Sequence, residues 1–163
     1  MTAHAKYNLT SSDGLTPQFG LGDEINVCGA QYKYVIAEGN VAAYALCTIA
    51  ANGDLTEATT TTVGTAARPT TLAIPQFALA DEEYGWVAVG PFGPYREDGS
   101  TTFKVLAANA ATSVRIYTTA TPGVVDDAVT TGLVAGLALT ETVTTQEAAD
   151  CVAVQRLVSF CEL

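Results

Sequence analysis

Short runs in which apolar and polar residues alternate recur along the chain from residue 26 onward, with Gly, Pro and Asn between them. Alternation with a period of two is typical of a β-strand that has one buried face. Turn residues separate the runs: Asn52-Gly53 predicts a type I′ hairpin turn, and Pro122-Gly123 predicts a second tight turn. The clearest runs are 31–37, 83–90, 101–108 and 112–120.

Only 74–83 and 144–150 show spacing that hints at a helix, and each is long enough for one or two turns. Strands at 8–12-residue spacing with turn residues between them are typical of all-β proteins. Because no helices are available to cover a sheet, the sheets must pack on each other or close on themselves. We therefore predict an all-β fold, either an antiparallel β-barrel or a β-sandwich of jelly-roll type, as a single domain over residues 26–163.

Residues 1–25 show neither the strand period nor the helix period and are rich in Thr, Ser, Gly and Asp. This composition predicts an extended N-terminal arm that is ordered only where something holds it. Isolated apolar residues can anchor the arm in grooves of a neighbouring subunit or on its own domain, and the sequence leaves both open. These anchors are Tyr7, Leu9, Leu15 and Phe19.

Charge and composition narrow the range of partners. The net charge is −10, and the seven Lys and Arg residues are dispersed, so the basic surface that nucleic acid or an anionic membrane requires is not expected. The longest apolar runs, 44–51 and 132–139, are shorter than the roughly 20 residues of a membrane-spanning helix. The N-terminus lacks a signal-peptide pattern, which favours synthesis without export. Charged residues are 15% of the chain, against about 25% usually, so some apolar surface is expected to meet another subunit.

Catalytic chemistry has little support in the sequence. His4 is the only histidine, and there is no nucleophile motif, phosphate-binding loop or dinucleotide fingerprint. The four cysteines lack the spacing of a zinc site, and we expect reduced thiols, with Cys47 and Cys151 buried. Three acidic clusters can in principle serve a hydrolase or a calcium site, but in loops they are ordinarily solvated: Asp81-Glu82-Glu83, Glu97-Asp98 and Asp126-Asp127. We predict a protein that is not an enzyme and has no catalytic residues, cofactor or metal.

Aromatic residues are the main candidates for binding. Tyr84 and Trp86 are two residues apart in one predicted strand and therefore face the same side, as sheet core, as subunit contacts or as an exposed stacking platform. The Gly-, Pro- and acid-rich segment 92–100 is predicted to project as a loop. The candidate interface residues are Tyr7, Leu9, Phe19, Tyr84, Trp86, Phe92 and Tyr95.

The segments 84–91 and 103–128, with Gly132 and 135–140, resemble the C-terminal half of phage head decoration (capsid cement) proteins. An aromatic-Gly-aromatic strand ends in Gly-Pro, and a Thr-Thr-Ala-Thr-Pro-Gly segment leads to two acids. The resemblance covers about residues 80–158 and is most specific from Thr118 to Asp127. It departs at the longer loop 92–101, and residues 26–80 carry no motif that aligns.

The resemblance implies a non-enzymatic virion protein on the outer surface of an icosahedral phage head, assembled in the host cytoplasm. It implies the major capsid protein as partner, together with other copies of the chain in a homotrimer or another small homo-oligomer. The main alternative is a carbohydrate-binding or adhesive head-fibre or tail module that uses exposed Tyr84, Trp86, Phe92 and Tyr95 for stacking. A small hydrolase with paired acids is a third reading.

Overall fold

A computed structural model describes residues 7–64, 70–92, 102–112, 114–130 and 132–161. About 47% of the chain is strand and 3% helix, which confirms the all-β prediction. One helix, α1 (Thr60–Gly64), is described, and it is too short to cross a membrane. The strands are β1 (Glu24–Val27), β2 (Ala30–Ala37), β3 (Cys47–Ile49), β4 (Asp54–Glu57), β5 (Thr70–Ala73), β6 (Tyr84–Ala88), β7 (Phe103–Ala107), β8 (Ile116–Thr118), β9 (Val125–Asp126), β10 (Gly132–Leu139) and β11 (Glu147–Cys161).

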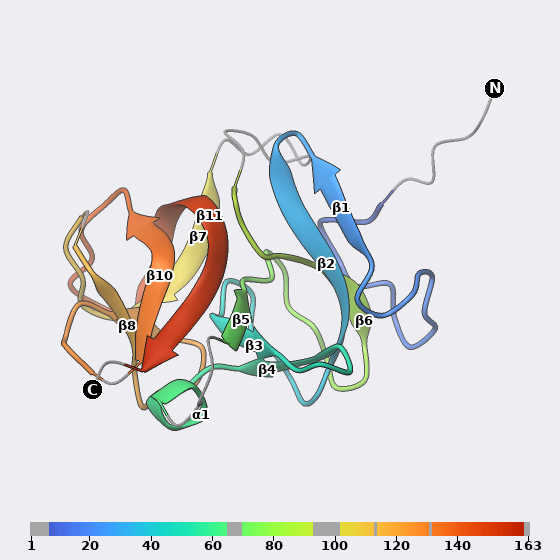
Figure 1. Ribbon diagram of the computed structural model, residues 1–163, viewed down its shortest axis with the longest axis horizontal. Helices are drawn as coiled ribbons and strands as arrows, with labels where there is room; N and C mark the ends of the chain where they lie inside the picture. Colours follow the sequence, from blue (N-terminus) through green and yellow to red (C-terminus); the bar gives the residue numbers. More distant parts are fainter. Residues whose placement is uncertain (1–6, 65–69, 93–101, 113, 131, 162–163) are drawn as a thin grey trace.

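Strands β7 to β11 close into a five-stranded barrel in the ring order β7-β9-β8-β10-β11. Every pair in the ring is antiparallel except β7 with β9, which is parallel. A closed ring with an odd number of strands cannot alternate direction throughout, so one parallel pair is unavoidable. Figure 1 shows β7, β8, β10 and β11 on the left of the molecule and β1, β2 and β6 on the right.

Strands β1 to β6 form a second set of pairs. Strand β2 pairs with β1 and β6 in antiparallel fashion and with β4 in parallel fashion. Strands β3 and β4 form a hairpin, and β3 also pairs with β5. Strand β5 joins the two sets, because it pairs with β11 as well.

Burial follows the predicted alternation in some strands. In β7, Phe103 and Val105 are buried and Lys104 is half-buried, as the pattern predicts. In β8, Ile116, Tyr117 and Thr118 are all buried, so the alternation predicted for 112–120 is wrong there. Both faces of this short strand are covered, because it lies in the closed ring with other segments packed outside it.

Both weak helix predictions are wrong. Ile74 forms a β-bridge with Ala88, and Leu79 forms one with Val41, while residues 147–150 begin β11 and pair with β7. Pairing with distant strands outweighs a weak local preference of this kind. The single helical turn lies in a Thr-rich run instead, where the Thr59 hydroxyl accepts the Thr62 backbone N–H at 3.1 Å as an N-cap.

Both predicted turns are placed correctly, and one of them differs in type. Asn52-Gly53 joins β3 and β4, as predicted, but only Gly53 has a positive φ, at 95°, so the turn is not type I′. A type I′ turn joins β1 and β2 instead, where Cys28 and Gly29 have φ of 51° and 83°. At the β8–β9 turn Gly123 has a φ of 72°, which suits the third position of a type II turn.

Gly123 brings the β8–β9 turn against the strands of the other set. Its carbonyl accepts the Leu46 N–H at 2.8 Å and its N–H donates to the Ala58 carbonyl at 2.9 Å. A Cβ at this position would lie 2.6 Å from the Ala45 Cβ. The turn therefore fits between the two segments only because residue 123 has no side chain.

Gly123→Ala is expected to lower the free energy of unfolding by about 3 kcal/mol. Roughly 1 kcal/mol comes from the left-handed backbone conformation, and about 2 kcal/mol comes from the clash with Ala45. Gly39→Ala is the matched control, since Gly39 has a φ of 90° with no atom within 4 Å of an added Cβ, and it should cost only the conformational part. Urea unfolding measures both, and equal losses would contradict the close contact at Gly123.

Candidate interaction surface

The N-terminal arm lies on the strands of its own chain in the described residues 7–23. Asp13 N–H donates to the Tyr84 carbonyl at 2.8 Å, and Tyr84 N–H donates to the Gly14 carbonyl at 3.0 Å. Further along, Tyr34 N–H donates to the Asp23 carbonyl at 2.8 Å. The arm thus pairs with β6 and then with β2 before it enters β1.

An aromatic cluster joins the arm to β2 and β6. We define it as Tyr7, Phe19, Tyr34, Tyr84 and Trp86. The Trp86 ring lies 5.3 Å from Tyr7, 5.1 Å from Phe19 and 5.0 Å from Tyr34, measured between ring centroids. Tyr34 and Tyr84 stack at 6.1 Å. Such pairs each contribute roughly 0.5–1.5 kcal/mol beyond burial, so ring contacts help to hold the arm over Trp86.

Tyr34 also holds the arm by hydrogen bonds. Its hydroxyl donates to Asp13 Oδ2 at 2.8 Å and accepts the Gln18 N–H at 3.1 Å. Burial, followed by the hydrogen bond to the Asp13 carboxylate, raises the pKa of Tyr34 to about 12. Tyr34 is absent from the candidate residues drawn from the sequence, although the alternation in 31–37 places Tyr32 and Tyr34 on one face.

The candidate residues fall into three groups. Trp86 and Leu9 are buried, at 1% and 5% exposure. Four others are half-buried and pack against the core: Tyr7, Phe19, Tyr84 and Phe92. Tyr95 lies outside the described residues.

Phe92 does not belong to the aromatic cluster. It stacks on Phe103 with ring centroids 4.5 Å apart and 14° between the planes, and its N–H donates to the Ala153 carbonyl. The sequence groups Phe92 with Trp86 by proximity along the chain, but the structure places it where β7 and β11 meet the segment after β6.

The indole N–H of Trp86 is buried and has no hydrogen-bond partner among the described residues. The arm therefore contacts Trp86 through apolar ring contacts and not through a hydrogen bond to the indole. The unpaired donor lowers the stability of the fold. The ring is fully covered and offers no exposed stacking face.

The acidic clusters hold loop backbones. Asp81 Oδ1 accepts the Gly39 N–H at 2.7 Å, and Asp127 Oδ2 accepts the Ala111 N–H at 3.1 Å. Burial raises the pKa of Asp126 above its usual value, and the negative charge of the adjacent Asp127 adds to this rise. Glu97 and Asp98 lie outside the described residues. Among the residues that are described, no group of three or more His, Cys, Asp or Glu could hold a metal ion.

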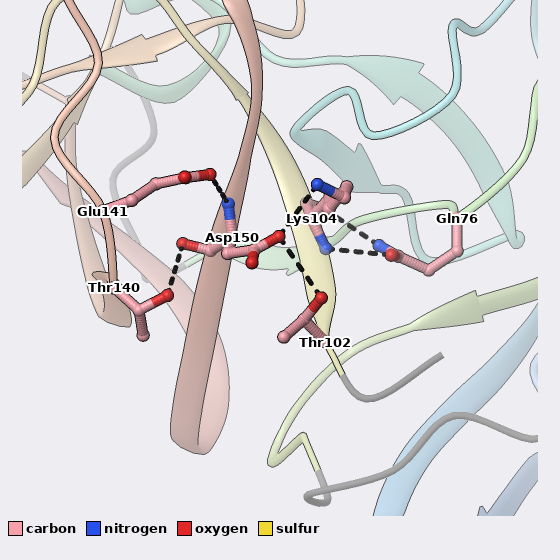
Figure 2. Close-up of polar contacts among 6 residues, drawn as sticks. All are labelled: Gln76, Thr102, Lys104, Thr140, Glu141 and Asp150. Carbon is pink, nitrogen blue, oxygen red and sulfur yellow. Dashed lines mark hydrogen bonds and ion pairs between the residues drawn. The ribbon is translucent and has the colours of Figure 1, made fainter. Parts of the chain in front are cut away.

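A polar cluster lies around Asp150 on β11. Its carboxylate contacts Lys104 Nζ at 2.8 Å and accepts the Thr102 hydroxyl at 3.2 Å. Its backbone N–H donates to Glu141 Oε1, and its carbonyl accepts the Thr140 hydroxyl (Figure 2). The hydrogen bond with Asp150 raises the pKa of Lys104. These contacts tie β11 to β7 and to the residues that follow β10.

Gln76 supplies the other contact in Figure 2. Lys104 N–H donates to Gln76 Oε1 and Gln76 Nε2 donates to the Lys104 carbonyl, both at 3.0 Å. The side-chain amide therefore pairs with β7 as a strand backbone would. Gln76 is 6% exposed, so this pair joins the segment after β5 to the barrel in a water-poor position.

The cysteines follow the prediction where they are described. Cys47 and Cys151 are buried and free, and Cys28 is exposed. Burial raises the pKa of both buried thiols, which keeps them protonated and unreactive.

No protein-family model, curated protein or solved structure matches this chain. Function is therefore inferred from the sequence pattern and from the geometry of the described residues.

Raising the pH should release the arm from Trp86. The unfolded pKa of tyrosine is about 10 and the folded value for Tyr34 is about 12. The folded pKa is raised, so this contribution to stability is fully present below about pH 10 and is lost as the pH rises toward about 12. Acrylamide quenching of Trp86 fluorescence should therefore increase over this range.

Tyr34→Phe is the control for the other tyrosines, because it keeps the ring and removes the hydroxyl. At pH 8 this variant should be less stable by about 1–2 kcal/mol, and the part of the alkaline transition that depends on Tyr34 should disappear. Identical alkaline profiles for the two proteins would contradict the clamping role of the hydroxyl.

Proposed function

We propose that this chain is a capsid decoration (cement) protein that binds the outer surface of an icosahedral phage head. Its partners are the major capsid protein and further copies of itself, in a homotrimer or another small homo-oligomer. The observation that carries the proposal is the sequence pattern from Tyr84 to Thr140. Its most specific part, Thr118–Asp127, spans the β8–β9 hairpin whose turn packs against Ala45 and Leu46.

Charge supports this location. A chain with a net charge of −10 is repelled by packaged DNA but is tolerated on the outer face of a shell. Stabilisation then follows from mass action, because a protein that binds only the expanded shell shifts the equilibrium toward that shell.

Exposed apolar residues indicate where the chain meets its partners. Most apolar groups of the arm pack inward, but Leu15 and Leu21 are 69% and 44% exposed. The outward side of the arm is therefore the proposed contact with the capsid or a neighbouring subunit. Val129, beyond β9, is 79% exposed and provides a comparison site on the barrel.

The carbohydrate-binding alternative requires exposed rings. Trp86 is covered by Tyr7 and Phe19, and Phe92 stacks on Phe103. No observation on the described residues favours that alternative.

Co-sedimentation with expanded shells of the major capsid protein encoded beside this chain tests the proposal. Saturable binding at a fixed ratio per capsid subunit is the expected result. Absence of binding by the full-length protein, at concentrations well above micromolar, would overturn the cement function.

Leu15→Asp and Leu21→Asp are expected to weaken binding at least about tenfold, since a charge must then be buried at the contact. Val129→Asp changes an exposed valine on the barrel and should leave binding unchanged. If only Val129→Asp weakens binding, the chain binds shells through the barrel and the arm is not the contact surface.

A further inference from the structure

Strands β2 to β6 repeat the connectivity of strands β7 to β11. In the barrel the first and third strands pair in parallel, and the second pairs with the third and fourth in antiparallel fashion. Strands β2, β3, β4 and β5 pair in the same way. The last strand of each set, β6 or β11, pairs with the first strand of its set.

The first set is also closed. Immediately after β5, Ile74 and Ala88 form a bridge in which each N–H donates to the other residue's carbonyl, at 2.8 and 3.3 Å. This bridge takes the place of the β10–β11 ladder. We infer that the chain is a tandem duplication of one five-stranded barrel, with barrel A formed by β2–β6 and barrel B by β7–β11.

The register of the parallel pairs agrees between the two barrels. Ala37 lies opposite Leu55 in barrel A, and Ala107 lies opposite Val125 in barrel B. The next residue donates its N–H to the same partner in each barrel: Glu38 to the Leu55 carbonyl at 3.0 Å, and Ala108 to the Val125 carbonyl at 2.9 Å. Ala107 follows Ala37 in the sequence by the same number of residues as Val125 follows Leu55. The two barrels therefore match in strand register as well as in strand order.

A bridge outside the strands is repeated as well. Val41 and Leu79 exchange backbone hydrogen bonds at 2.8 and 3.0 Å. Ala110 and Val143 do the same at 3.0 and 2.9 Å. In each barrel this bridge ties the connection after the first strand to the segment that leads into the last strand.

One side-chain contact is conserved between the barrels. Glu57 Oε1 accepts the Ala42 N–H at 2.8 Å, and Asp127 Oδ2 accepts the Ala111 N–H at 3.1 Å. Glu57 is the last residue of β4 and Asp127 comes directly after β9, so each acid lies at the end of the third strand of its barrel and holds the residue after the bridge. Matching interior positions are buried in both barrels, for example Val35 and Val105, Cys47 and Ile116, and Ala73 and Val134.

The duplication reveals a docking edge that recurs in both barrels. At Tyr34 on β2, the backbone pairs with Gly22 N–H at 2.9 Å and the Asp23 carbonyl at 2.8 Å, both from the arm. At Lys104, the matching residue on β7, the backbone pairs with the Gln76 side-chain amide. The same strand position thus binds a segment from outside its barrel in each copy, in the manner of an added strand.

Side chains beside the docking edge have diverged. Tyr34 faces Trp86 across β2 and β6 in barrel A. The matching pair in barrel B is Lys104 with Asp150. Barrel A therefore holds an aromatic arm, whereas barrel B presents an ion pair to solvent and uses barrel A itself as the partner of its edge.

Hydrogen exchange of backbone amides in the unmodified full-length chain tests the duplication. The exchange rates of amides at matched positions are expected to agree within about tenfold, because equivalent parts of the two barrels should open with similar free energies. The pairs are Glu38 with Ala108, Val41 with Ala110, and Tyr34 with Lys104. Ile74 and Ala88 should be protected as well, and if they exchange as fast as unpaired loop amides, barrel A is open and the duplication is overturned.

Substitutions test the docking edge and the shared acid contact. Gln76→Ala should speed exchange at Lys104 by about fivefold or more, from the loss of its hydrogen bond, and leave Tyr34 unchanged. Glu57→Ala and Asp127→Ala should each speed exchange of the amide that it holds, Ala42 or Ala111, by a similar factor. Unchanged protection at Lys104 would overturn the docking edge, and a response from only one acid variant would overturn the shared contact.

Discussion

Closure of an odd number of strands is the constraint on which this structure depends. Five strands cannot alternate direction around a ring, so one pair must be parallel, as β7 and β9 are. A parallel pair cannot be joined by a tight turn, so β8, which is antiparallel to β9 and therefore to β7, carries the chain back before the β8–β9 hairpin. The connection from β7 to β8 stays at one end of the barrel and crosses over β9, which lies between these two strands in the ring. That crossing connection is irregular, and its backbone groups need partners that a ladder does not supply. Asp127 provides one of them at the Ala111 N–H.

The loop acids follow from the same constraint. In a loop a carboxylate is ordinarily solvated, but Asp81 and Asp127 accept backbone N–H groups from distant segments. A charged acceptor makes a stronger hydrogen bond than a neutral one, which suits a connection that has no strand neighbour. Acidic clusters that suggest catalysis when read along the sequence therefore have a structural role in the described residues.

The two sets of strands share close contacts and are not structurally independent. Thr71 on β5 pairs with Val158 on β11, and the Gln76 amide pairs with β7. A Cβ on Gly90 would lie 2.4 Å from the Gln155 carbonyl oxygen, which shows how closely the end of β6 approaches β11. Backbone and side-chain contacts of this kind couple the two sets of strands.

Sequence periodicity predicted those parts of the fold in which one face of a strand is solvated. Residues 31–34 are such a case, since Lys33 alternates with buried Tyr32 and Tyr34 in β2, but the alternation ends at Val35, which is buried on the opposite face. It failed where long-range pairing or burial on both faces determines the structure, as at Ile74, which closes a ring with Ala88. The duplication left a weak trace in residue identity. Val35 and Val105 are identical, but interior positions need only be apolar, so Cys47 matches Ile116, and positions outside the barrel diverge, as Tyr34 and Lys104 do.

Placement of the arm bears on how the chain could meet a partner. Trp86 is central to the aromatic cluster, and it is already covered by Tyr7 and Phe19 from the same chain. A partner that used this surface would have to displace the arm and break the hydrogen bonds of Tyr34 to Asp13 and Gln18. Contact through the outward side of the arm avoids that cost and keeps the cover in place. The aromatic residues then fix the shape of the arm, and Leu15 and Leu21 remain exposed on its outward side, where we propose that the partner binds.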